Sequence, residues 1–432
     1  MRTSNPRYYK WTQWIFIQLF NSWYNKDTDR AEDISTLISI FKKEGNLCVN
    51  ASCDEDIKEF TSEQWEAFSK KEQEEILLQY RLTFLSDTEV NWCPQLGTVL
   101  ANDEIINGVS ERGGHPVVRK KMTQWSMRIS AYAQRLLDGL KSIDWPQPLK
   151  DSQTNWIGRS QGAMVSFKID GHDGMIDVFT TRPDTIFGVS FMTLAPEHEL
   201  VSKITTSAQK TEVENYISAT AKRSERERMA DVKTISGVFT GAYAIHPFSG
   251  EKVQIWIGDY VLAGYGTGAV MAVPCGDQRD YDFAKYFKIP IPNIFEGVDI
   301  SEQAHTDKEG TIIANSDFLS GLSYKKALKL SIYELEKQKL VYGKINYRLR
   351  DAVFSIQRYW GEPFPVYYKG GMPQMISTEH LPIILPEVEK YLPTKDGRPP
   401  LGNAKVWAWD TETNEVVENT KINHQTIFQQ LH

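Results

Sequence analysis

The chain has 432 residues, 41% of them hydrophobic, which is enough for two or three domains that each bury a core. Its net charge of −7 argues against a protein that coats nucleic acid non-specifically, although a local basic groove is compatible with it. The uncharged run Trp11–Asn25 is too short and too polar to span a bilayer, so we expect a cytoplasmic protein with no membrane partner.

The four cysteines are scattered, and no two of them form a Cys-x-x-Cys pair. This spacing indicates neither a disulfide framework nor a standard zinc knuckle. Cys48, Cys53 and Cys93 could join a fourth ligand on one metal ion, which remains an alternative. Reduced thiols are the expected state, and no metal is predicted.

Helices are predicted before residue 80. A largely buried helix is expected at residues 9–23, with no strand or cap before it, which suggests that the chain starts inside a domain. Its apolar residues are Trp11, Trp14, Ile15, Ile17 and Leu19. Ser62 is placed to cap a second helix that runs through Trp65 and residues 76–78.

A small β-rich unit is predicted at residues 87–118, and a long amphipathic helix follows it. The residues of its apolar face, at steps of three or four, are Met122, Trp125, Ile129, Tyr132, Leu136 and Leu140. The segment 144–148, Asp-Trp-Pro-Gln-Pro, ends this helix because proline lacks an N–H donor and clashes with the preceding turn. We therefore place a domain boundary near residues 144–155.

Strands and helices alternate between about residues 155 and 345, which is typical of a compact α/β unit with its own core. The predicted strands are 164–169, 175–179, 253–257 and 269–273, and the predicted helices are 211–228 and 323–340. After residue 347 the character changes again, and residues 395–400, Lys-Asp-Gly-Arg-Pro-Pro, indicate a turn.

The first stretch with chemical potential is Thr180–Gly188, which reads T-T-R-P-D-T-I-F-G between the strand that ends near residue 180 and a second strand expected at 186–194. A rigid polar corner between two strands is a good place for a site, because a scaffold can hold it still. A simple Thr/Pro turn that reverses the chain is the alternative. The side chains here that can bind or catalyse are Thr180, Thr181, Arg182, Asp184 and Thr185.

The second stretch is Gly264–Ala284. Its glycines fit neither a phosphate loop nor a dinucleotide fingerprint, since no Gly-Lys-Ser/Thr follows and they open a strand rather than a helix. Asp277 is expected to cap the following helix. Asp280, inside the first turns, is harder to explain as a cap, and a free carboxylate beside an apolar strand could hold an ammonium group.

Neither stretch contains a nucleophile with a base beside it, and no His/Asp cluster has the spacing of metal ligands. His172, His198 and His246 are interpreted as surface or loop histidines. A hydrolase built from these residues would place a water molecule against the substrate rather than form a covalent intermediate.

These two stretches, Thr180–Gly188 and Gly266–Asp280, resemble the editing domain of bacterial-type leucyl-tRNA synthetases. The flanking segments that agree with this resemblance are 9–16, 91–94, 124–125, 156–160 and 357–363. The similarity extends to about residue 420. The resemblance implies an α/β chain: part of a class I, Rossmann-like catalytic domain with a small β-rich insertion, and a compact editing domain with a barrel-like core.

The resemblance also implies a domain division and a partner. The expected parts are residues 1–35 and 347–432 of the catalytic domain, 36–154 as the small insertion with its linking helix, and 155–346 as the editing domain. The expected partner is the acceptor end of tRNA(Leu), bound by a monomer. The expected reaction is hydrolysis of the ester that joins isoleucine, valine, methionine or a similar amino acid to that tRNA, while leucine is spared.

Family members assign roles to matching positions. Thr185 matches the threonine that bars leucine from the pocket, and Asp280 matches the aspartate that binds the substrate's ammonium group. Thr180, Thr181 and Arg182 match residues that position the ester and the attacking water or contact the terminal adenosine. Further residues match those that line the pocket or hold the tRNA end: Asp184, Tyr265, Met271, Val273, Asp277 and Arg279.

Both family signatures for aminoacyl-adenylate formation, His-x-Gly-His and Lys-Met-Ser-Lys-Ser, are missing from the sequence. We therefore predict that this chain does not charge tRNA, that editing needs no cofactor, and that ATP and Mg²⁺ serve only the full-length parent. A module that binds the acceptor end without catalysis is the alternative. Gly276 and Ala352 depart from a common histidine and a common tryptophan, and residues 429–432 do not continue the family pattern.

Overall fold

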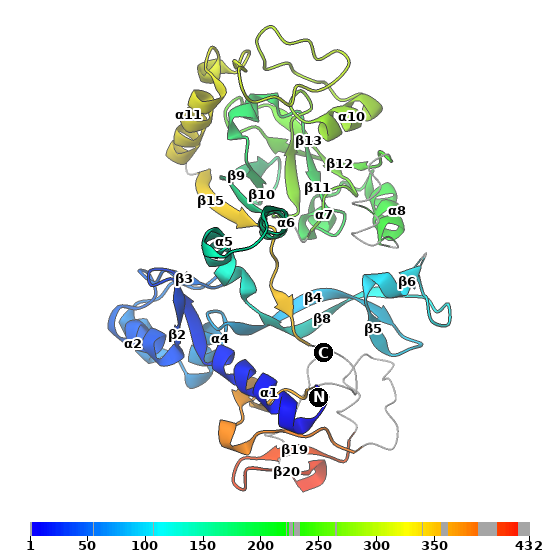
Figure 1. Ribbon diagram of the computed structural model, residues 1–432. Helices are drawn as coiled ribbons and strands as arrows, with labels where there is room; N and C mark the ends of the chain where they lie inside the picture. Colours follow the sequence, from blue (N-terminus) through cyan, green and yellow to red (C-terminus); the bar gives the residue numbers. More distant parts are fainter. Residues whose placement is uncertain are drawn as a thin grey trace. The chain divides into compact units, whose positions relative to one another are not determined.

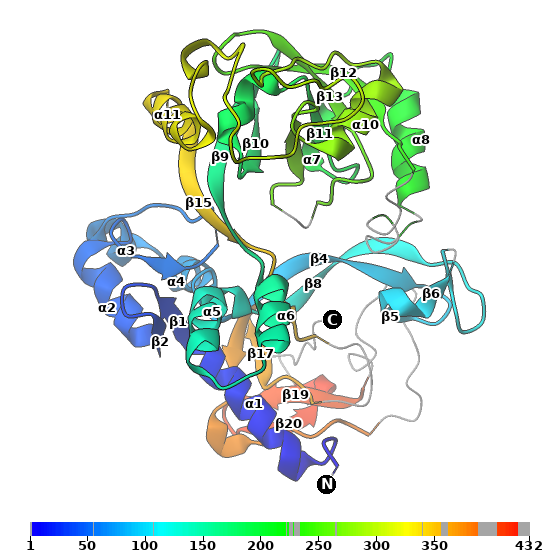
Figure 2. The ribbon, with the colours of Figure 1, turned by 45° about the horizontal axis from the view of Figure 1, so that its top comes forward.

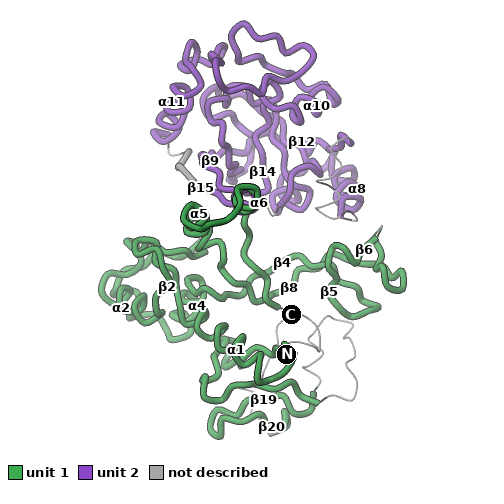
Figure 3. Tube along the Cα trace, in the orientation of Figure 1, with its two compact units in different colours: residues 1–153, 349–432 green, residues 154–348 purple. Residues whose placement is uncertain are grey.

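A computed structural model describes residues 2–54, 56–106, 108–221, 223, 228, 234–263, 266–338, 340–355, 362–387 and 404–421. The chain divides into two compact units, residues 1–153 with 349–432 (unit 1) and residues 154–348 (unit 2), as Figure 3 shows. Several predictions fall outside the described residues: Tyr265, most of the segment 357–363, the turn at 395–400, residues 429–432 and parts of the helix 211–228.

Unit 1 combines short helices with small sheets, in which the described strands pair antiparallel. Its helices are α1 Pro6–Phe20, α2 Ile34–Glu44, α3 Ser62–Ala67, α4 Lys70–Leu78, α5 Ala133–Ser142 and α6 Gln147–Ile157, the last of which crosses into unit 2; its 3-10 helices are η1 Asn102–Glu104, η2 Ile129–Tyr132, η5 Thr378–His380 and η7 Asn419–Lys421. Its strands are β1 Ser22–Asn25, β2 Arg30–Asp33, β3 Ala51–Ser52, β4 Thr83–Cys93, β5 Thr98–Leu100, β6 Ile105–Ile106, β7 Val109–Ser110, β8 Val118–Met127, β16 Ala352–Val353, β17 Val366–Lys369, β18 Met372–Met375, β19 Val406–Asp410 and β20 Glu415–Glu418.

The predicted helix over residues 122–140 is wrong in its first half. Met122 and Trp125 lie on β8, opposite Thr88 and Leu85 of β4. Met122 packs in one small cluster and Trp125, on the other face, packs in another, and residues 124–126 are buried on both faces of the strand. Burial on both faces removes the alternation that marks a half-exposed strand, so the spacing imitated a helix. Helical structure begins only at η2 and continues into α5.

The first predicted helix exists as α1, but the buried face differs from the expected one. Trp11 and Trp14 are 58% and 42% exposed, and Ile15 is exposed as well, whereas Phe16 and Phe20 are buried. A helix has one face toward a core, and apolar residues around its whole circumference did not show which face that is. The second predicted helix is two helices, α3 and α4, and the α3 cap is Thr61 rather than Ser62.

Unit 2 is built on a seven-stranded sheet (Figures 1 and 2). Six strands follow the order β10-β9-β12-β13-β11-β14, and β15 pairs with residues 159–165 of β9. The strands are β9 Arg159–Ile169, β10 Met175–Thr180, β11 Phe191–Leu194, β12 Val238–Ile245, β13 Lys252–Ile257, β14 Ala269–Ala272 and β15 Val341–Tyr347. The helices are α7 Glu199–Ile204, α8 Lys210–Thr220, α10 Gln278–Phe287 and α11 Tyr324–Lys337, with 3-10 helices η3 Pro183–Gly188 and η4 Asp317–Leu319. Strands and helices in both units confirm the predicted α/β class.

The sheet of unit 2 is mostly antiparallel, with β11 and β13 as a parallel pair. The strands at the two ends of the order, β10 and β14, lie close together, so the sheet is strongly curved. Its apolar side chains form one large core that includes Val165, Val178 and Ile255. This curvature brings the end of β10 and the end of β14 to the same region of the unit.

The four strands predicted in unit 2 are confirmed, but the strand expected at 186–194 is not. Residues 183–188 form η3, and only Phe191–Leu194 is a strand. Pro183 opens η3 with a φ that suits a helical turn. Gly162 on β9 lets this corner approach, since a Cβ at that position would lie 2.2 Å from the Thr180 carbonyl oxygen. No helix among the described residues is long and apolar enough to cross a membrane.

Candidate functional site

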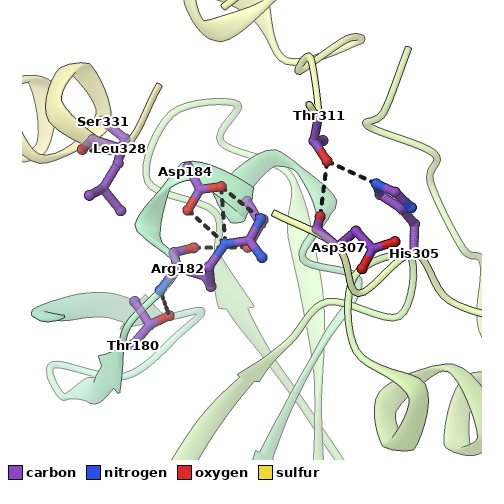
Figure 4. A network of polar contacts seen from close by, with 9 residues as sticks. Thr180, Arg182, Asp184, His305, Asp307, Thr311, Leu328 and Ser331 are labelled. Carbon is purple, nitrogen blue, oxygen red and sulfur yellow. Dashed lines mark hydrogen bonds and ion pairs between the residues drawn. The ribbon is translucent and has the colours of Figure 1, made fainter. Parts of the chain in front are cut away.

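The η3 corner, residues Thr180–Gly188, is held by hydrogen bonds between its own threonine side chains and its backbone, some of which Figure 4 shows. Thr180 ends β10, and its Oγ1 accepts a hydrogen bond from the Arg182 N–H at 3.0 Å. The Arg182 carbonyl oxygen accepts two bonds from Thr185, one from the backbone N–H at 3.0 Å and one from Oγ1 at 2.8 Å. Short polar side chains that bond to nearby backbone favour such turns over regular strands. The corner is therefore a fixed structure, with Thr185 buried and Thr181 exposed.

The charged pair of this corner is satisfied internally. Arg182 donates from Nε to both Asp184 oxygens, at 3.0 and 3.2 Å, and from Nη2 to Oδ2 at 2.9 Å. The Asp184 side chain is fully buried and that of Arg182 is 15% exposed. The guanidinium also lies 4.9 Å from the ring centre of Tyr324, at the start of α11. A planar cation held by a carboxylate and a ring has little freedom, so Asp184 and Tyr324 fix the position of Arg182.

The second stretch meets the first at Gly188. A Cβ on Gly188 would lie 3.0 Å from Val273 Cγ1 and from Cys275 Sγ, which shows how closely η3 packs on the residues after β14. β14 also pairs with β11, with Met192 opposite Met271. Met271 and Val273 are buried. Segments that are far apart in the sequence thus form one continuous region.

Asp277 and Asp280 differ in their surroundings although they are three residues apart. Asp277 caps α10, and its Oδ1 accepts from the N–H groups of Arg279 and Asp280 at 2.9 and 3.1 Å. Asp280 is only 6% exposed, and its Oδ2 accepts from the Val273 N–H at 2.9 Å. Asp277 is thus the cap that its position predicted, whereas Asp280 lies inside the unit.

Burial, the largest cause, and the nearby Asp277 charge raise the pKa of Asp280 to about 8. Hydrogen bonding to the Val273 N–H, the Arg279 charge and the Tyr260 hydroxyl act in the opposite direction without compensating. A carboxyl with such a pKa is largely neutral at pH 7 and gains most from a cation that arrives beside it. Strongly shifted groups of this kind are candidates for functional residues.

His246, interpreted from the sequence as a surface or loop histidine, lies in a loop, but it is buried. It follows β12 and is 4% exposed. Its Nδ1 accepts from the N–H groups of Phe248 and Ser249, and its Nε2 is 3.0 Å from the Ile186 carbonyl oxygen. This pattern requires the neutral ring with a proton on Nε2, and burial lowers the pKa of His246 accordingly. His246 therefore anchors η3 through its hydrogen bond to the Ile186 carbonyl oxygen.

The structure brings most of the predicted site residues together in two adjoining groups. Thr180, Arg182, Asp184 and Thr185 belong to the η3 network, while Met271, Val273 and Asp280 lie at the end of β14 and the start of α10. The sequence analysis missed Tyr324 and His246. Their roles depend on a ring over Arg182 and a bond to Ile186, and no short-range pattern in the sequence carries such contacts.

Among the residues that the structure describes, no group of three or more His, Cys, Asp or Glu side chains is placed to hold a metal ion. Cys48 is exposed and Cys93 is buried. Cys53 lies 3.7 Å from the Ala51 carbonyl oxygen, and burial raises its thiol pKa. The chemistry available around η3 is that of hydroxyls, a fixed guanidinium and a buried carboxyl.

Comparison with known proteins gives consistent matches. Residues 154–336 match the family model for the leucyl-tRNA synthetase editing domain. The chain is 67% identical to a leucine–tRNA ligase of Flavobacterium psychrophilum, over 99% of this chain and 47% of that relative. It is 69% identical to the leucine–tRNA ligase of Christiangramia forsetii, over 97% of this chain and 44% of that relative. The chain therefore spans about half the length of these curated relatives.

A solved structure agrees with these matches. The crystal structure of the ternary complex of Agrobacterium radiobacter K84 agnB2 LeuRS-tRNA-LeuAMS is similar with a TM-score of 0.58 and 32% sequence identity. The similarity covers 78% of this chain and 39% of that chain.

Proposed function

Because this chain belongs to the leucyl-tRNA synthetase family, with residues 154–336 as its editing domain, we propose that unit 2 hydrolyses the ester of mischarged tRNA(Leu). The observation that supports this most strongly is the buried carboxyl of Asp280 beside the η3 corner. Its substrates would be esters of isoleucine, valine, methionine or similar amino acids. One copy of the chain holds all the residues assigned to the site, so we expect a monomer. We also expect the protein to work in the cytoplasm.

The ammonium group of the aminoacyl ester is assigned to Asp280. A buried carboxyl with a pKa of about 8 is costly to ionise alone, but a bound cation within a few ångströms favours the charged form. The carboxyl then changes from a neutral group into the partner of a salt bridge as substrate binds. Selectivity for a free α-ammonium follows, because a blocked amine brings no cation, so Asp280 stays neutral and the salt bridge does not form.

The ester and the attacking water are assigned to the η3 corner. Arg182 is held by Asp184 and Tyr324 before any substrate arrives, so no reorganisation is needed when charge develops on the ester oxygen. Thr180 and the exposed Thr181 supply hydroxyls at the same corner. Water is the nucleophile, and catalysis comes from its placement against the carbonyl carbon.

Discrimination is assigned to Thr185. A pocket that activates leucine distinguishes a single methylene by only about 1–3 kcal/mol, so a second site that removes wrong products is needed. The Thr185 hydroxyl is engaged by the Arg182 carbonyl oxygen, which leaves its bulk as the feature that meets a side chain of the substrate. We expect the buried Met271 and Val273 to line the same pocket.

The terminal nucleotide is assigned to the exposed end of α10. Arg279 is exposed there beside Asp277, and its guanidinium lies 5.9 Å from the Tyr260 ring centre. Tyr265, outside the described residues, is expected from the resemblance alone to line the pocket or hold the tRNA end. A guanidinium near an aromatic ring suits both phosphate and a base.

The test uses the 432-residue chain and tRNA(Leu) charged with labelled isoleucine. We expect loss of the ester above the rate without protein, and no such loss with Asp280→Ala. Retained activity in Asp280→Ala would contradict its assigned role. Binding of tRNA(Leu) without deacylation would instead support an acceptor-end binding module. Aminoacylation with ATP and Mg²⁺ is proposed only for the whole enzyme, because this sequence contains neither signature motif.

A further inference from the structure

Gly188 is the point at which the η3 corner touches the residues that follow β14. It ends η3, three residues after Thr185, and its backbone does not have the positive φ that would require a glycine. Its neighbours do require one. A Cβ at this position would lie 3.0 Å from Val273 Cγ1, Cys275 Sγ and Ile294 Cδ1, whereas carbon atoms in contact prefer about 3.5–4.0 Å.

The three neighbours of Gly188 are buried, and they differ in their ability to move. Ile294 Cδ1 is the end of a long side chain and has the most freedom. The γ atoms of Val273 and Cys275 are one bond from Cβ, and the β-branched Val273 is stiff at χ1 as well. An added methyl group at Gly188 would therefore move the backbone of η3 away from that of Val273, by about 0.5 Å.

The Val273 side of this contact is tied to Asp280 through the backbone. The Val273 N–H donates to Asp280 Oδ2 at 2.9 Å. Its carbonyl oxygen accepts from the N–H groups of Gly276 and Asp277 at 2.9 and 3.0 Å, and Asp277 Oδ1 accepts from the Asp280 N–H at 3.1 Å. Residues 273–280 thus form one hydrogen-bonded turn, so a displacement of Val273 also displaces the Asp280 carboxyl.

The η3 side of the contact is fixed in the same way. Thr185 donates from its N–H at 3.0 Å and from Oγ1 at 2.8 Å to the Arg182 carbonyl oxygen. The Ile186 carbonyl oxygen lies 3.0 Å from His246 Nε2. With these bonds η3 moves as one piece, so a change of spacing at Gly188 is transmitted to Thr185.

We propose that Gly188 is a positioning residue for selectivity: because it has no side chain, it fixes how far Thr185 lies from the Asp280 carboxyl. The inference rests on the proposed roles of Thr185 and Asp280. A substrate held by its ammonium group at Asp280 presents its side chain at a set distance, so this spacing determines which side chains fit. Functional groups must be held to within about 0.5 Å, which is the displacement that a Cβ at Gly188 would cause.

The test is Gly188→Ala in the full chain, with Gly276→Ala as the matched control. A Cβ at Gly276 would approach the same Val273 methyl group, but at 3.5 Å, an ordinary contact. Loss of labelled amino acid is measured from Ile-tRNA(Leu) and from Leu-tRNA(Leu). The ratio of the two rates should fall about 5- to 10-fold in Gly188→Ala, because leucine gains space, and should keep its wild-type value in Gly276→Ala.

A lower melting temperature of Gly188→Ala with an unchanged ratio would overturn the proposal, since a purely structural glycine affects folding without altering selectivity. If Gly188→Ala does not fold, the same change is made together with Cys275→Ala and Ile294→Val. These two changes remove the Sγ and Cδ1 contacts and leave the one with Val273. The chain with these two changes alone is then the reference, and an equal ratio with and without Gly188→Ala would overturn the proposal.

Absence of deacylation by the wild-type chain would overturn the proposed function instead. NMR spectra of the Val273 methyl groups and of its N–H still decide the spacing. Both signals should shift in Gly188→Ala and much less in Gly276→Ala. Equal shifts in the two variants would contradict the role of Gly188.

Discussion

The two halves of the proposed site handle charge in opposite ways. In the η3 corner, Arg182 and Asp184 neutralise each other, and the threonines satisfy the backbone. At the start of α10, Asp280 is buried with a backbone N–H as its hydrogen-bond donor and a pKa of about 8. The first half is rigid and its charges are paired, whereas the second holds a buried carboxyl that a cationic ligand can stabilise in its charged form. Changes in the two halves should therefore differ in kind.

The largest expected effect on stability is in the η3 corner. Asp184→Asn leaves the Arg182 charge without its buried partner, and breaking one side of such a pair costs about 3–5 kcal/mol. Chemical denaturation of the chain, followed by a probe in unit 2, measures this loss. Glu199→Gln, at the exposed pair with Lys203, is the control and should change the free energy of unfolding by less than about 0.5 kcal/mol. Equal effects of the two changes would contradict the contrast.

Asp280→Asn should stabilise the chain near neutral pH, because it removes a buried carboxyl that is costly to ionise. The folded pKa of about 8 lies above the ordinary value of 3.8, so folding of the wild type becomes less favourable as pH rises from about 4 to 8. Asparagine has no such dependence. Between pH 5.5 and 7.5 the variant should gain about 2 kcal/mol relative to the wild type. Denaturation curves at both pH values test this, and a difference that is independent of pH would count against a buried neutral carboxyl.

His246→Phe should cost about 1–2 kcal/mol, because Ile186 O loses its donor and two N–H groups lose their acceptor. The folded pKa of His246 is below its ordinary 6.5, so protonation opposes folding and the wild type should lose stability as pH falls below 6.5. The variant should lose less over that range. Thermal denaturation at pH 5 and 7 measures both effects, with His172→Phe, at an exposed histidine, as the control.

The smallest effect is expected at Gly276. A Cβ there would meet neighbours at 3.5 Å, an ordinary contact, so Gly276→Ala should change the free energy of unfolding by less than about 0.5 kcal/mol. Gly162→Ala is the contrasting variant, since its Cβ would lie 2.2 Å from the Thr180 carbonyl oxygen. Comparable melting temperatures for both variants would show that the η3 corner is less tightly packed than described.

Local patterns predicted much of unit 2. The strands predicted at 164–169, 175–179, 253–257 and 269–273 are confirmed, and each is a short segment rich in apolar residues with turn residues nearby. The same reasoning failed for Met122 and Trp125, where burial on both faces of β8 removed the alternation. It also extended a strand over 186–188, where bonds from Thr185 to Arg182 favour a helical turn.

The polar residues at 180–185 and Asp280 were found by the types of side chain they carry. The resemblance to the family supplied the rest: Tyr265, Met271, Val273 and Arg279. All of these roles remain predictions. The sequence showed only in part which carboxylates are already bound within the fold. Asp277 had the position of a helix cap and is one, but the sequence analysis did not predict the ion pair between Asp184 and Arg182. His246 and Tyr324 act through contacts between distant segments. Such contacts depend on how the sheet curves, and a single sequence does not contain that information.

The most direct test of the account is the specificity of Thr185→Ala. The wild-type chain should hydrolyse Ile-tRNA(Leu) and spare Leu-tRNA(Leu), each measured as loss of labelled amino acid from tRNA(Leu). Removing the Thr185 side chain opens the space that excludes leucine, so the variant should hydrolyse Leu-tRNA(Leu) as well. A variant that folds, still hydrolyses Ile-tRNA(Leu) and continues to spare leucine would contradict the claim that the η3 corner selects the substrate.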